Sequence, residues 1–252
     1  MNPFDLRGKT MVITGGTNGI GKGLVEFFAK QGVQVAAVGS RKESAEKLKQ
    51  DMAALQLEVS VYHADLRQVD AIQPLFDRMA QDLQHIDILI NCAGMGNPLP
   101  ATSVTEKDWN DMMDLNVRAT FFCSQAAAKY MLPRGWGRIV NITSQLSVVA
   151  NENEAVYCAS KGAINNLTRA LSYEWSKDGV IVSAVAPTFT YTPGTAERLD
   201  NAEFKKGVLE RIPRGRLGTI EDIGAAVQYL CSDHADMASG AILFIDGGWT
   251  IV

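Results

Sequence analysis

Tyr157 and Lys161 are the two residues whose types and spacing point most directly to chemistry. They are four positions apart, and on a helix that spacing places two side chains on the same face. A lysine ammonium beside a phenol favours the phenolate and lowers the phenol pKa from about 10. A tyrosine tuned in this way can exchange protons near neutral pH. The same spacing also occurs on solvated helix faces, so the rest of the chain must decide between the two readings.

Ser144 lies thirteen positions before Tyr157 and directly follows the apolar run Gly137–Thr143, which we expect to be a buried strand. The carboxyl ends of strands form the rim of the sheet where α/β enzymes keep their sites. Residues 144–161 are therefore the candidate catalytic stretch.

A glycine-rich turn near the start of the chain is the candidate cofactor site. The apolar run Thr10–Thr14 predicts a buried parallel strand, and Gly15-Gly-Thr-Asn-Gly-Ile-Gly separates it from a predicted helix at Lys22–Lys30. Such glycines permit a tight turn and let backbone N–H groups approach a pyrophosphate at a helix N-terminus. The spacing differs from the commoner Gly-x-Gly-x-x-Gly, and a glycine turn by itself can be only a turn. Its position between strand and helix favours dinucleotide binding.

The second predicted strand, Gln34–Val38, ends in Gly-Ser-Arg-Lys. No acidic residue stands there to hold a ribose 2′-hydroxyl, as an NAD site usually requires. Ser40 and Arg41 favour a 2′-phosphate instead, because a guanidinium matches phosphate oxygens. We therefore expect NADP(H) in preference to NAD(H). The alternative is that Arg41 and Lys42 are solvated residues that open the next helix.

Two further polar residues allow two interpretations each. Asp65 follows the third predicted strand, Glu58–Tyr62, and either accepts a hydrogen bond from an adenine amino group or caps the helix that begins near Val69. Asn116 lies in an apolar stripe of a long helix predicted for residues 105–132. From the residues alone, a satisfied core amide is the better interpretation of Asn116.

Strands and helices alternate along the whole sequence, which predicts an α/β fold with a doubly wound parallel sheet (a Rossmann fold) in a single domain, residues 1–252. Residues 191–215 are irregular in pattern, and we expect a mobile substrate lid at about 190–215. The remaining predicted strands are 85–91, 139–143, 180–185 and 242–245, and the remaining predicted helices are 44–55, 71–83, 155–177 and 221–231.

Composition narrows the classes of function. The chain has 252 residues, 46% of them hydrophobic, with a net charge of −4, which argues against a nucleic-acid partner. No apolar run approaches the roughly 20 residues that cross a membrane, and the first nine residues lack a signal-peptide core. The four cysteines are scattered, so we expect reduced thiols, a cytoplasmic location and no metal site.

Taken together, the motifs resemble those of the short-chain dehydrogenase/reductase family over nearly the whole chain. The matching features are Thr14-Gly-Gly-Thr-Asn-Gly-Ile-Gly, Asp65, Asn91-Cys-Ala-Gly, Asn116, Ser144, Tyr157-Cys-Ala-Ser-Lys161 and Asp246-Gly-Gly, in the family's order and spacing.

The resemblance implies an NAD(P)-dependent oxidoreductase with four catalytic residues. Tyr157 would be the acid/base, Ser144 would hold the substrate oxygen, and Lys161 would bind the nicotinamide ribose and lower the Tyr157 pKa. Asn116 would hold a water that passes protons onward from Lys161, which replaces its interpretation as a core amide. The implied cofactor-binding residues are Gly15, Thr17, Asn18, Gly19, Ile20, Ser40, Arg41, Asp65, Leu66, Asn91, Ala93, Gly94, Tyr157, Lys161, Pro187, Thr188, Thr190 and Thr192.

Two positions depart from the family pattern. Cys92 stands where the family usually has a second asparagine, a small change. Thr188 follows Pro187 where the family usually has glycine. Because threonine tolerates positive φ far less well than glycine, we expect the turn beside the nicotinamide to differ here.

We expect the stretches after Ser144 and Pro187 to form most of the substrate-binding site. The predicted substrate-binding residues are Ser144, Gln145, Leu146, Asn151, Asn153, Tyr157 and Phe189, with Met95, Gly96 and Tyr191 completing the wall. This mixture of amides, hydroxyls and apolar groups predicts a small polar ketone and its secondary alcohol, of the polyol, sugar or sugar-acid type.

Two alternatives stay open. A 3-oxoacyl-(acyl-carrier-protein) reductase would need a basic docking patch, which the net charge does not support. A non-catalytic cofactor-binding regulator would belong to a different class, and the intact catalytic residues argue against it. The resemblance also implies a homotetramer, in agreement with the apolar residues Phe121, Phe122, Leu167, Leu171 and Trp175 and with the apolar C-terminal residues 248–252.

Overall fold

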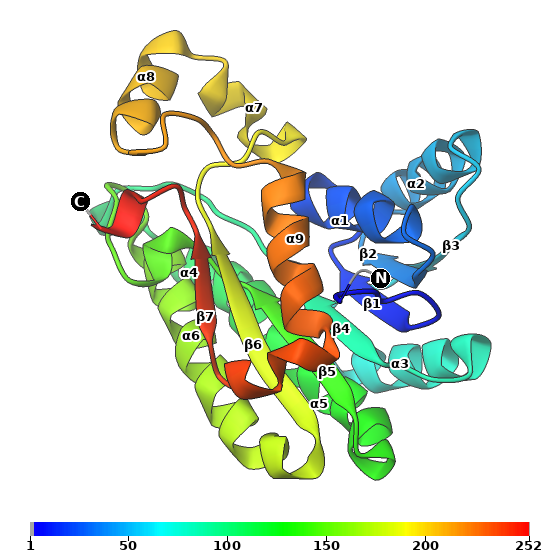
Figure 1. Cartoon of the computed structure of the whole chain (residues 1–252). Coiled ribbons are helices and arrows are strands. Elements are labelled where there is room, and N and C mark those ends of the chain that lie inside the picture. The colour runs from blue at the N-terminus through cyan, green and yellow to red at the C-terminus, as the bar shows by residue number, and fades with distance from the viewer. Residues whose placement is uncertain (1–2, 252) are drawn as a thin grey trace.

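Seven parallel strands form one sheet in the order β3-β2-β1-β4-β5-β6-β7 (Figure 1). The computed structural model describes residues 3–251, so the parts of the predictions that fall on residues 1, 2 and 252 lie outside it. The doubly wound sheet confirms the predicted fold class. The strands are β1 (Thr10–Thr14), β2 (Gln34–Gly39), β3 (Val59–His63), β4 (Ile88–Asn91), β5 (Gly137–Ile142), β6 (Val180–Pro187) and β7 (Ile242–Ile245).

Helices cover both faces of this sheet (Figure 1). One hydrophobic cluster joins the sheet to α1, α2 and α9, and a second cluster joins it to α3, α5 and α6. The helices are α1 (Gly19–Ala29), α2 (Lys42–Ala54), α3 (Val69–Leu83), α4 (Glu106–Met113), α5 (Ala119–Met131), α6 (Ala155–Trp175), α7 (Pro193–Leu199), α8 (Ala202–Glu210) and α9 (Ile220–Cys231).

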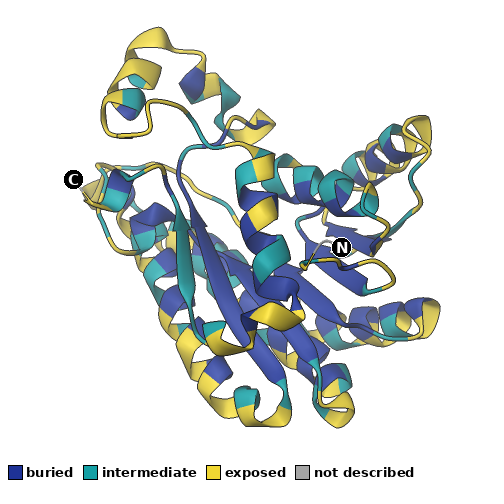
Figure 2. Cartoon of the chain, in the orientation of Figure 1, coloured by how far each residue is buried: buried dark blue, intermediate teal, exposed yellow. Residues whose placement is uncertain are grey.

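Strand β1 shows why both faces must be covered. Met11 and Ile13 belong to the first cluster, whereas Val12 between them belongs to the second. Successive side chains of a strand point to opposite faces, so an all-apolar strand needs helices on both sides. Figure 2 shows the result, with central strands buried between helices whose outer surfaces are exposed.

The strand order reverses between β2-β1 and β1-β4, because β1 pairs with both β2 and β4. Connections leave toward opposite sides at such a switch point, and a crevice opens beyond the carboxyl ends of the strands. The glycine turn follows β1 at this edge, and Ser144 follows β5 there. The topology therefore places the cofactor turn and the candidate catalytic stretch on the same rim.

Residues 191–215 differ from the prediction of an irregular segment, because they contain α7 and α8. Thr192 and Thr195 form a capping box with Pro193 at the first turn of α7, and the Asn201 side chain caps α8. Such caps stabilise helices too short for periodicity to reveal. In Figure 1 this pair of helices projects beyond the carboxyl end of β6.

The long helix predicted for residues 105–132 is also more complex. Between α4 and α5 it passes through a π-helical turn, Asp114–Arg118, which contains Asn116. Such single π turns are frequent at functional sites because they redirect side chains. Among residues 3–251, no helix combines the length and apolar character needed to cross a membrane.

Candidate active site

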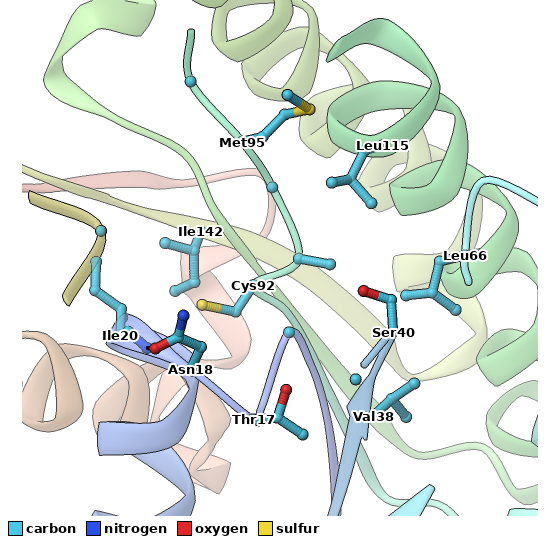
Figure 3. Close-up of a pocket in the computed structure, with 18 of the residues that line it drawn as sticks. Thr17, Asn18, Ile20, Val38, Ser40, Leu66, Cys92, Met95, Leu115 and Ile142 are labelled. Atoms are coloured by element: carbon cyan, nitrogen blue, oxygen red, sulfur yellow. Dashed lines mark hydrogen bonds between the residues drawn. The ribbon is translucent and has the colours of Figure 1, made fainter. Parts of the chain in front are cut away.

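A cavity of about 520 Å³ opens at the carboxyl edge of the sheet. Figure 3 shows its wall, with Thr17 and Asn18 from the glycine turn, Ser40 after β2 and Cys92 after β4 around a common space. The predicted residues that line it are Gly15, Thr17, Asn18, Gly19, Ile20, Ser40, Arg41, Asp65, Leu66, Ala93, Gly94, Tyr157, Lys161 and Thr192.

The cavity wall also contains residues that sequence reasoning missed. Most of them adjoin a predicted residue at the end of a strand, so proximity to the strand ends was the available signal. Leu115 is different, because it reaches the cavity from the π turn that periodicity could not reveal. The residues missed are Val38, Gly39, Ala64, Arg67, Cys92, Leu115, Ile142, Thr143 and Gly194. Gly21 of the predicted glycine turn and Met95 and Gly96 of the predicted substrate wall also line the cavity.

The glycine turn leaves no room for a side chain at Gly15 or Gly21. Gly15 has φ +66°, and a Cβ there would lie 2.8 Å from Ala93 Cα. A Cβ at Gly21 would lie 2.3 Å from the Gly15 carbonyl oxygen, so α1 begins directly on the turn. The Asn18 side chain accepts a hydrogen bond from Gly19 N at 2.8 Å, which starts the helix. The close backbone approach and the helix N-terminus fit the pyrophosphate of a dinucleotide.

The far end of the cavity carries positive charge. Ser40 and Arg41 line it after β2, and Arg67 lines it after β3. Arg67 Nη2 lies 2.8 Å from Asp65 Oδ2, whereas no ion pair forms at Arg41 within the described part of the chain. Hydrogen bonds from the Arg67 side chain hold the Asp65 pKa below its ordinary value. Arg41 is thus the guanidinium left available to an anionic ligand.

The alternative assignment of Asp65 as a helix cap is wrong. The residue at the N-cap of α3 is Gln68, whose side chain makes no capping hydrogen bond. Asp65 Oδ1 instead accepts from Arg67 N at 3.1 Å. The Asp65 carboxylate therefore bonds to Arg67 in its own loop, at the wall of the cavity.

Four predicted cofactor residues lie outside the cavity lining. Asn91 Nδ2 donates to Ser124 Oγ and Asn141 Oδ1, both at 2.9 Å, so this side chain cross-links β4 to its neighbours. The other three residues, Pro187, Thr188 and Thr190, belong to the end of β6 and the strand-like stretch that follows it.

Thr188 adopts an ordinary backbone conformation. Within residues 3–251, positive φ at non-glycine residues occurs at Gln56, Gln84 and Asn153 alone. Thr188 N donates to Ile245 O at 3.2 Å, which continues the β6–β7 pairing. Thr188 therefore causes no positive-φ strain at this position, and the expected difference from the family's turn stays a prediction.

Two hydrogen bonds fix the helix that carries Tyr157 and Lys161 to the end of β5. Lys161 Nζ donates to Ile142 O at 2.9 Å, and Thr143 Oγ1 donates to Lys161 O at 3.1 Å. Ser144, the next residue, accepts from Leu146 N through its hydroxyl oxygen at 3.1 Å. Strand and helix thereby bring Ser144, Tyr157 and Lys161 together, although Ser144 is distant from them in sequence.

The expectation that Lys161 lowers the Tyr157 pKa concerns the enzyme with its cofactor bound and stays a prediction. Among the protein's own groups, burial has the largest effect on the Tyr157 pKa. Burial raises the pKa of Tyr157 to about 12, and a hydrogen bond from Ser144 opposes that rise. Burial also lowers the pKa of Lys161 to about 8. Its Nζ lies 5.6 Å from the centroid of the Tyr157 ring, on the same face of the helix.

Asn116 is fully hydrogen-bonded in the π turn. Its Oδ1 accepts from Met95 N at 2.8 Å, and its Nδ2 donates to Met95 O at 2.9 Å and to Ser160 Oγ at 3.0 Å. Asn116 therefore ties the loop after β4 to α6 beside Lys161. The side chain has the contacts of a satisfied amide and lies at the catalytic rim.

A second cavity, of about 460 Å³, lies under α8. Of the predicted substrate residues, Asn151 and Phe189 line it, together with Asn201, Glu203, Phe204, Gly207, Val208, Arg211 and Trp249. Gln145 and Leu146 are buried beneath the rim, whereas Asn153 is exposed.

A turn held by Asp246 places the C-terminal residue Trp249 in the wall of this second cavity. The Asp246 carboxylate accepts hydrogen bonds from Gly248 N and Thr250 N, both at 2.9 Å. The turn buries Trp249 against Phe189, with ring centroids 5.6 Å apart. Trp249 is therefore part of this chain's own core, whereas Ile251 is exposed.

Known proteins match this chain over nearly its whole length. Residues 15–250 match the family model described as enoyl-(acyl carrier protein) reductase. The chain is 36% identical over 250 residues to 2-dehydro-3-deoxy-D-gluconate 5-dehydrogenase of Escherichia coli (strain K12), covering 99% of this chain and 98% of that one. It is 35% identical over 248 residues to D-threitol dehydrogenase of Mycolicibacterium smegmatis, covering 98% and 95%.

Among solved structures, a gluconate 5-dehydrogenase from Burkholderia cenocepacia J2315 in complex with NADP and tartrate superposes with a TM-score of 0.94. It is 30% identical, and the match covers 100% of this chain and 98% of that chain.

Proposed function

This chain belongs to the short-chain dehydrogenase/reductase family, and on that premise we propose that it interconverts a small polar ketone and its secondary alcohol. It is an NAD(P)-dependent oxidoreductase, and its substrates are of the polyol, sugar or sugar-acid class. The observation that carries this is the hydrogen bond of Ser144 with Tyr157 beside the cavity that Tyr157 and Lys161 line together with the glycine turn. Full-length similarity to dehydrogenases named for a sugar acid and a polyol supports the substrate class.

Each catalytic residue has one task in this reaction. The nicotinamide cofactor supplies or accepts the hydride when it is bound. Ser144 holds the reacting oxygen by a hydrogen bond, and Tyr157 gives that oxygen a proton in reduction or takes one from the alcohol in oxidation. The Lys161 ammonium favours the phenolate that remains after proton transfer. Asn116 holds the loop after β4 in register with α6 and belongs to the same proton path.

The proposed cofactor is NADP(H). The glycine turn, Ser40 and Arg41 would hold it, with Asp65 and Leu66 beside the adenine and Ala93 and Gly94 beside the ribose. Arg41 lines the cavity without a carboxylate partner among the described residues, so a 2′-phosphate meets an uncompensated guanidinium there. Pro187, Thr188, Thr190 and Thr192 would form the nicotinamide end.

Substitution of Arg41 tests the cofactor assignment. Arg41→Met is expected to raise the KM for NADPH about tenfold, since one charge-assisted hydrogen bond to phosphate is lost, and to leave the KM for NADH almost unchanged. Steady-state kinetics with both cofactors measures this. Lys9→Met is the control, because Lys9 stacks on Trp136 away from the cavity. Equal losses for NADPH and NADH would contradict the assignment.

Turnover across one substrate panel tests the function itself. The panel contains short polyols, sugar acids, their ketones and a 3-oxoacyl thioester, each assayed with NADP(H) and NAD(H). Turnover of polyols or sugar acids is expected. Preference for the thioester would instead indicate a 3-oxoacyl reductase, and cofactor binding without any turnover would indicate a regulator.

We also propose where the protein works, which residues form its substrate lid and how many copies assemble. The free cysteines Cys92, Cys123, Cys158 and Cys231 support a reducing, cytoplasmic location. Residues 190–215, which contain α7 and α8, form the substrate lid of the single domain, and the working form is a homotetramer.

A further inference from the structure

Glu154 is a buried carboxylate that the proposed reaction does not use. It lies directly before the helix of Tyr157, at the N-cap of α6, and only 6% of its surface is exposed. A buried carboxylate costs free energy unless it is paired. Its side chain makes no capping hydrogen bond to α6, so capping does not explain it.

Its partner comes from the segment beyond β6. Arg198 Nη1, in the last turn of α7, donates to Glu154 Oε1 at 3.1 Å. The Arg198 guanidinium carbon also lies 4.7 Å from the Phe204 ring centroid and 5.9 Å from that of Phe189. One arginine thus joins α7, α8 and the start of the catalytic helix.

The position of this pair matters for the substrate. Phe189 and Phe204, the two rings beneath Arg198, line the cavity under α8. On its other side Glu154 lies close enough to Tyr157 for its charge to act on the phenol. The pair therefore connects the start of the helix that carries Tyr157 to two rings in the wall of the cavity.

We propose that Glu154 and Arg198 are positioning residues, whose ion pair anchors the lid helices α7 and α8 to the catalytic helix and neutralises the carboxylate beside Tyr157 when the lid is closed. The role in turnover rests on the proposed function, whereas the anchoring does not.

The consequence for Tyr157 has a definite sign. A negative charge near a phenol disfavours the phenolate, and Glu154 acts on Tyr157 in that direction. Arg198 offsets that charge while α7 is docked, and the offset is lost when α7 moves away. The other groups around the phenol are Lys161 and Cys158 on α6, Cys92 after β4 and Ser144 after β5, and neither substitution below alters them. Docking of the lid thus makes proton release by Tyr157 easier.

Two substitutions separate anchoring from charge. Glu154→Gln and Arg198→Met both break the ion pair, so each is expected to raise the KM for the alcohol about five- to tenfold. Their effects on the pH dependence of oxidation are expected to be opposite. Glu154→Gln removes the negative charge and moves the rise of kcat/KM to lower pH, by roughly half a pH unit. Arg198→Met leaves the negative charge of Glu154 uncompensated and moves the rise of kcat/KM to higher pH.

Three further variants serve as controls. Arg198→Lys keeps the charge and is expected to restore most of the KM and the wild-type pH profile. The double variant is expected to have a KM no worse than either single one, because both break the same contact. Glu210→Gln removes a carboxylate on α8 that pairs with Lys206 at 3.9 Å, and neither its KM nor its profile should change.

Limited proteolysis measures how firmly α7 and α8 are held to the catalytic helix, and it needs no substrate. Cleavage within residues 199–202, between α7 and α8, is expected to be several-fold faster in Glu154→Gln and Arg198→Met than in wild type and Glu210→Gln. If wild type turns over no substrate, the proposed function fails while this measurement still decides the anchor. Unchanged cleavage, or pH profiles that move in the same direction, would overturn the proposal.

Discussion

Tyr157 and Lys161 show how burial opposes charge on both members of an acid/base pair. The pKa of the phenol rises to about 12 and that of the ammonium falls to about 8. Both shifts favour the neutral forms, as desolvation requires. The phenol therefore keeps its proton at neutral pH, the state needed to reduce a ketone.

Replacement of Tyr157 by phenylalanine removes the acid/base and leaves the ring in place. We expect kcat to fall roughly a hundred- to ten-thousand-fold, with the affinity for the cofactor changed only slightly. Steady-state rates and titration of NADPH fluorescence measure the two quantities. Tyr173→Phe is the matched control, since Tyr173 is 90% exposed on the same helix. Retention of most activity in Tyr157→Phe would remove Tyr157 from the mechanism.

The pH dependence of ketone reduction follows from Lys161. Its pKa is lowered to about 8, so the ammonium is present below that pH and lost above it. Tyr157 stays protonated throughout this range. We therefore expect kcat/KM for reduction to be level up to about pH 8 and to fall above it, whereas oxidation rises with pH as the phenol releases its proton. A reduction rate that climbs through this pH would contradict the assignment.

At the scale of elements, the glycine turn joins β1 to α1 with no spare volume. Gly21 is the sharpest case, because a Cβ would lie 2.3 Å from backbone oxygen rather than from a movable side chain. The helix N-terminus cannot approach both the turn and a pyrophosphate once that volume is filled.

Gly21→Ala is therefore expected to weaken cofactor binding by at least about tenfold, because α1 must shift off the turn. Isothermal titration with NADPH measures the loss. Gly207→Ala is the control, because a Cβ at Gly207 meets nothing within 4 Å and this residue lies outside the cofactor cavity. Equal affinities for the two variants would show that α1 does not need to touch the turn.

At the scale of the molecule, one exposed aromatic side chain, Trp109, bears on the predicted homotetramer. Trp109 on α4 is 45% exposed, and it lines a shallow apolar hollow with Val104 and Val156. Apolar patches of this kind mark protein interfaces. The hollow is formed by α4 and the first residues of α6, whereas the apolar residues that predict assembly from the sequence lie on α5 and α6.

Light scattering is expected to give the mass of a homotetramer. Trp109→Glu places a charge in the apolar hollow and is expected to shift the population toward smaller species, because an unpaired charge opposes burial. Lys49→Glu, on the exposed face of α2, is the control for charge alone. A wild-type chain that remains monomeric at micromolar concentration would refute the prediction.

Local sequence determined much of this protein. Apolar runs such as Thr10–Thr14 and Ile242–Ile245 predicted their strands to the residue, because apolar side chains of a parallel strand pack against the helices that cover the sheet. Alternation of strands and helices then determined a parallel doubly wound sheet. The candidate catalytic stretch could be proposed from the sequence because the spacing from Tyr157 to Lys161 is local to one helix.

Tertiary structure decided whatever depends on residues that are distant in the sequence. Only the fold shows that the side-chain nitrogen of Asn91, a predicted cofactor residue, donates to Ser124 and Asn141. Periodicity averages over turns, so it could not locate the π turn at Asn116 or the short capped helices α7 and α8. No local pattern in the sequence indicated a role for Glu154, because its partner, Arg198, lies 44 positions away. The pKa values of Tyr157 and Lys161 likewise depend on burial, which only the folded chain creates.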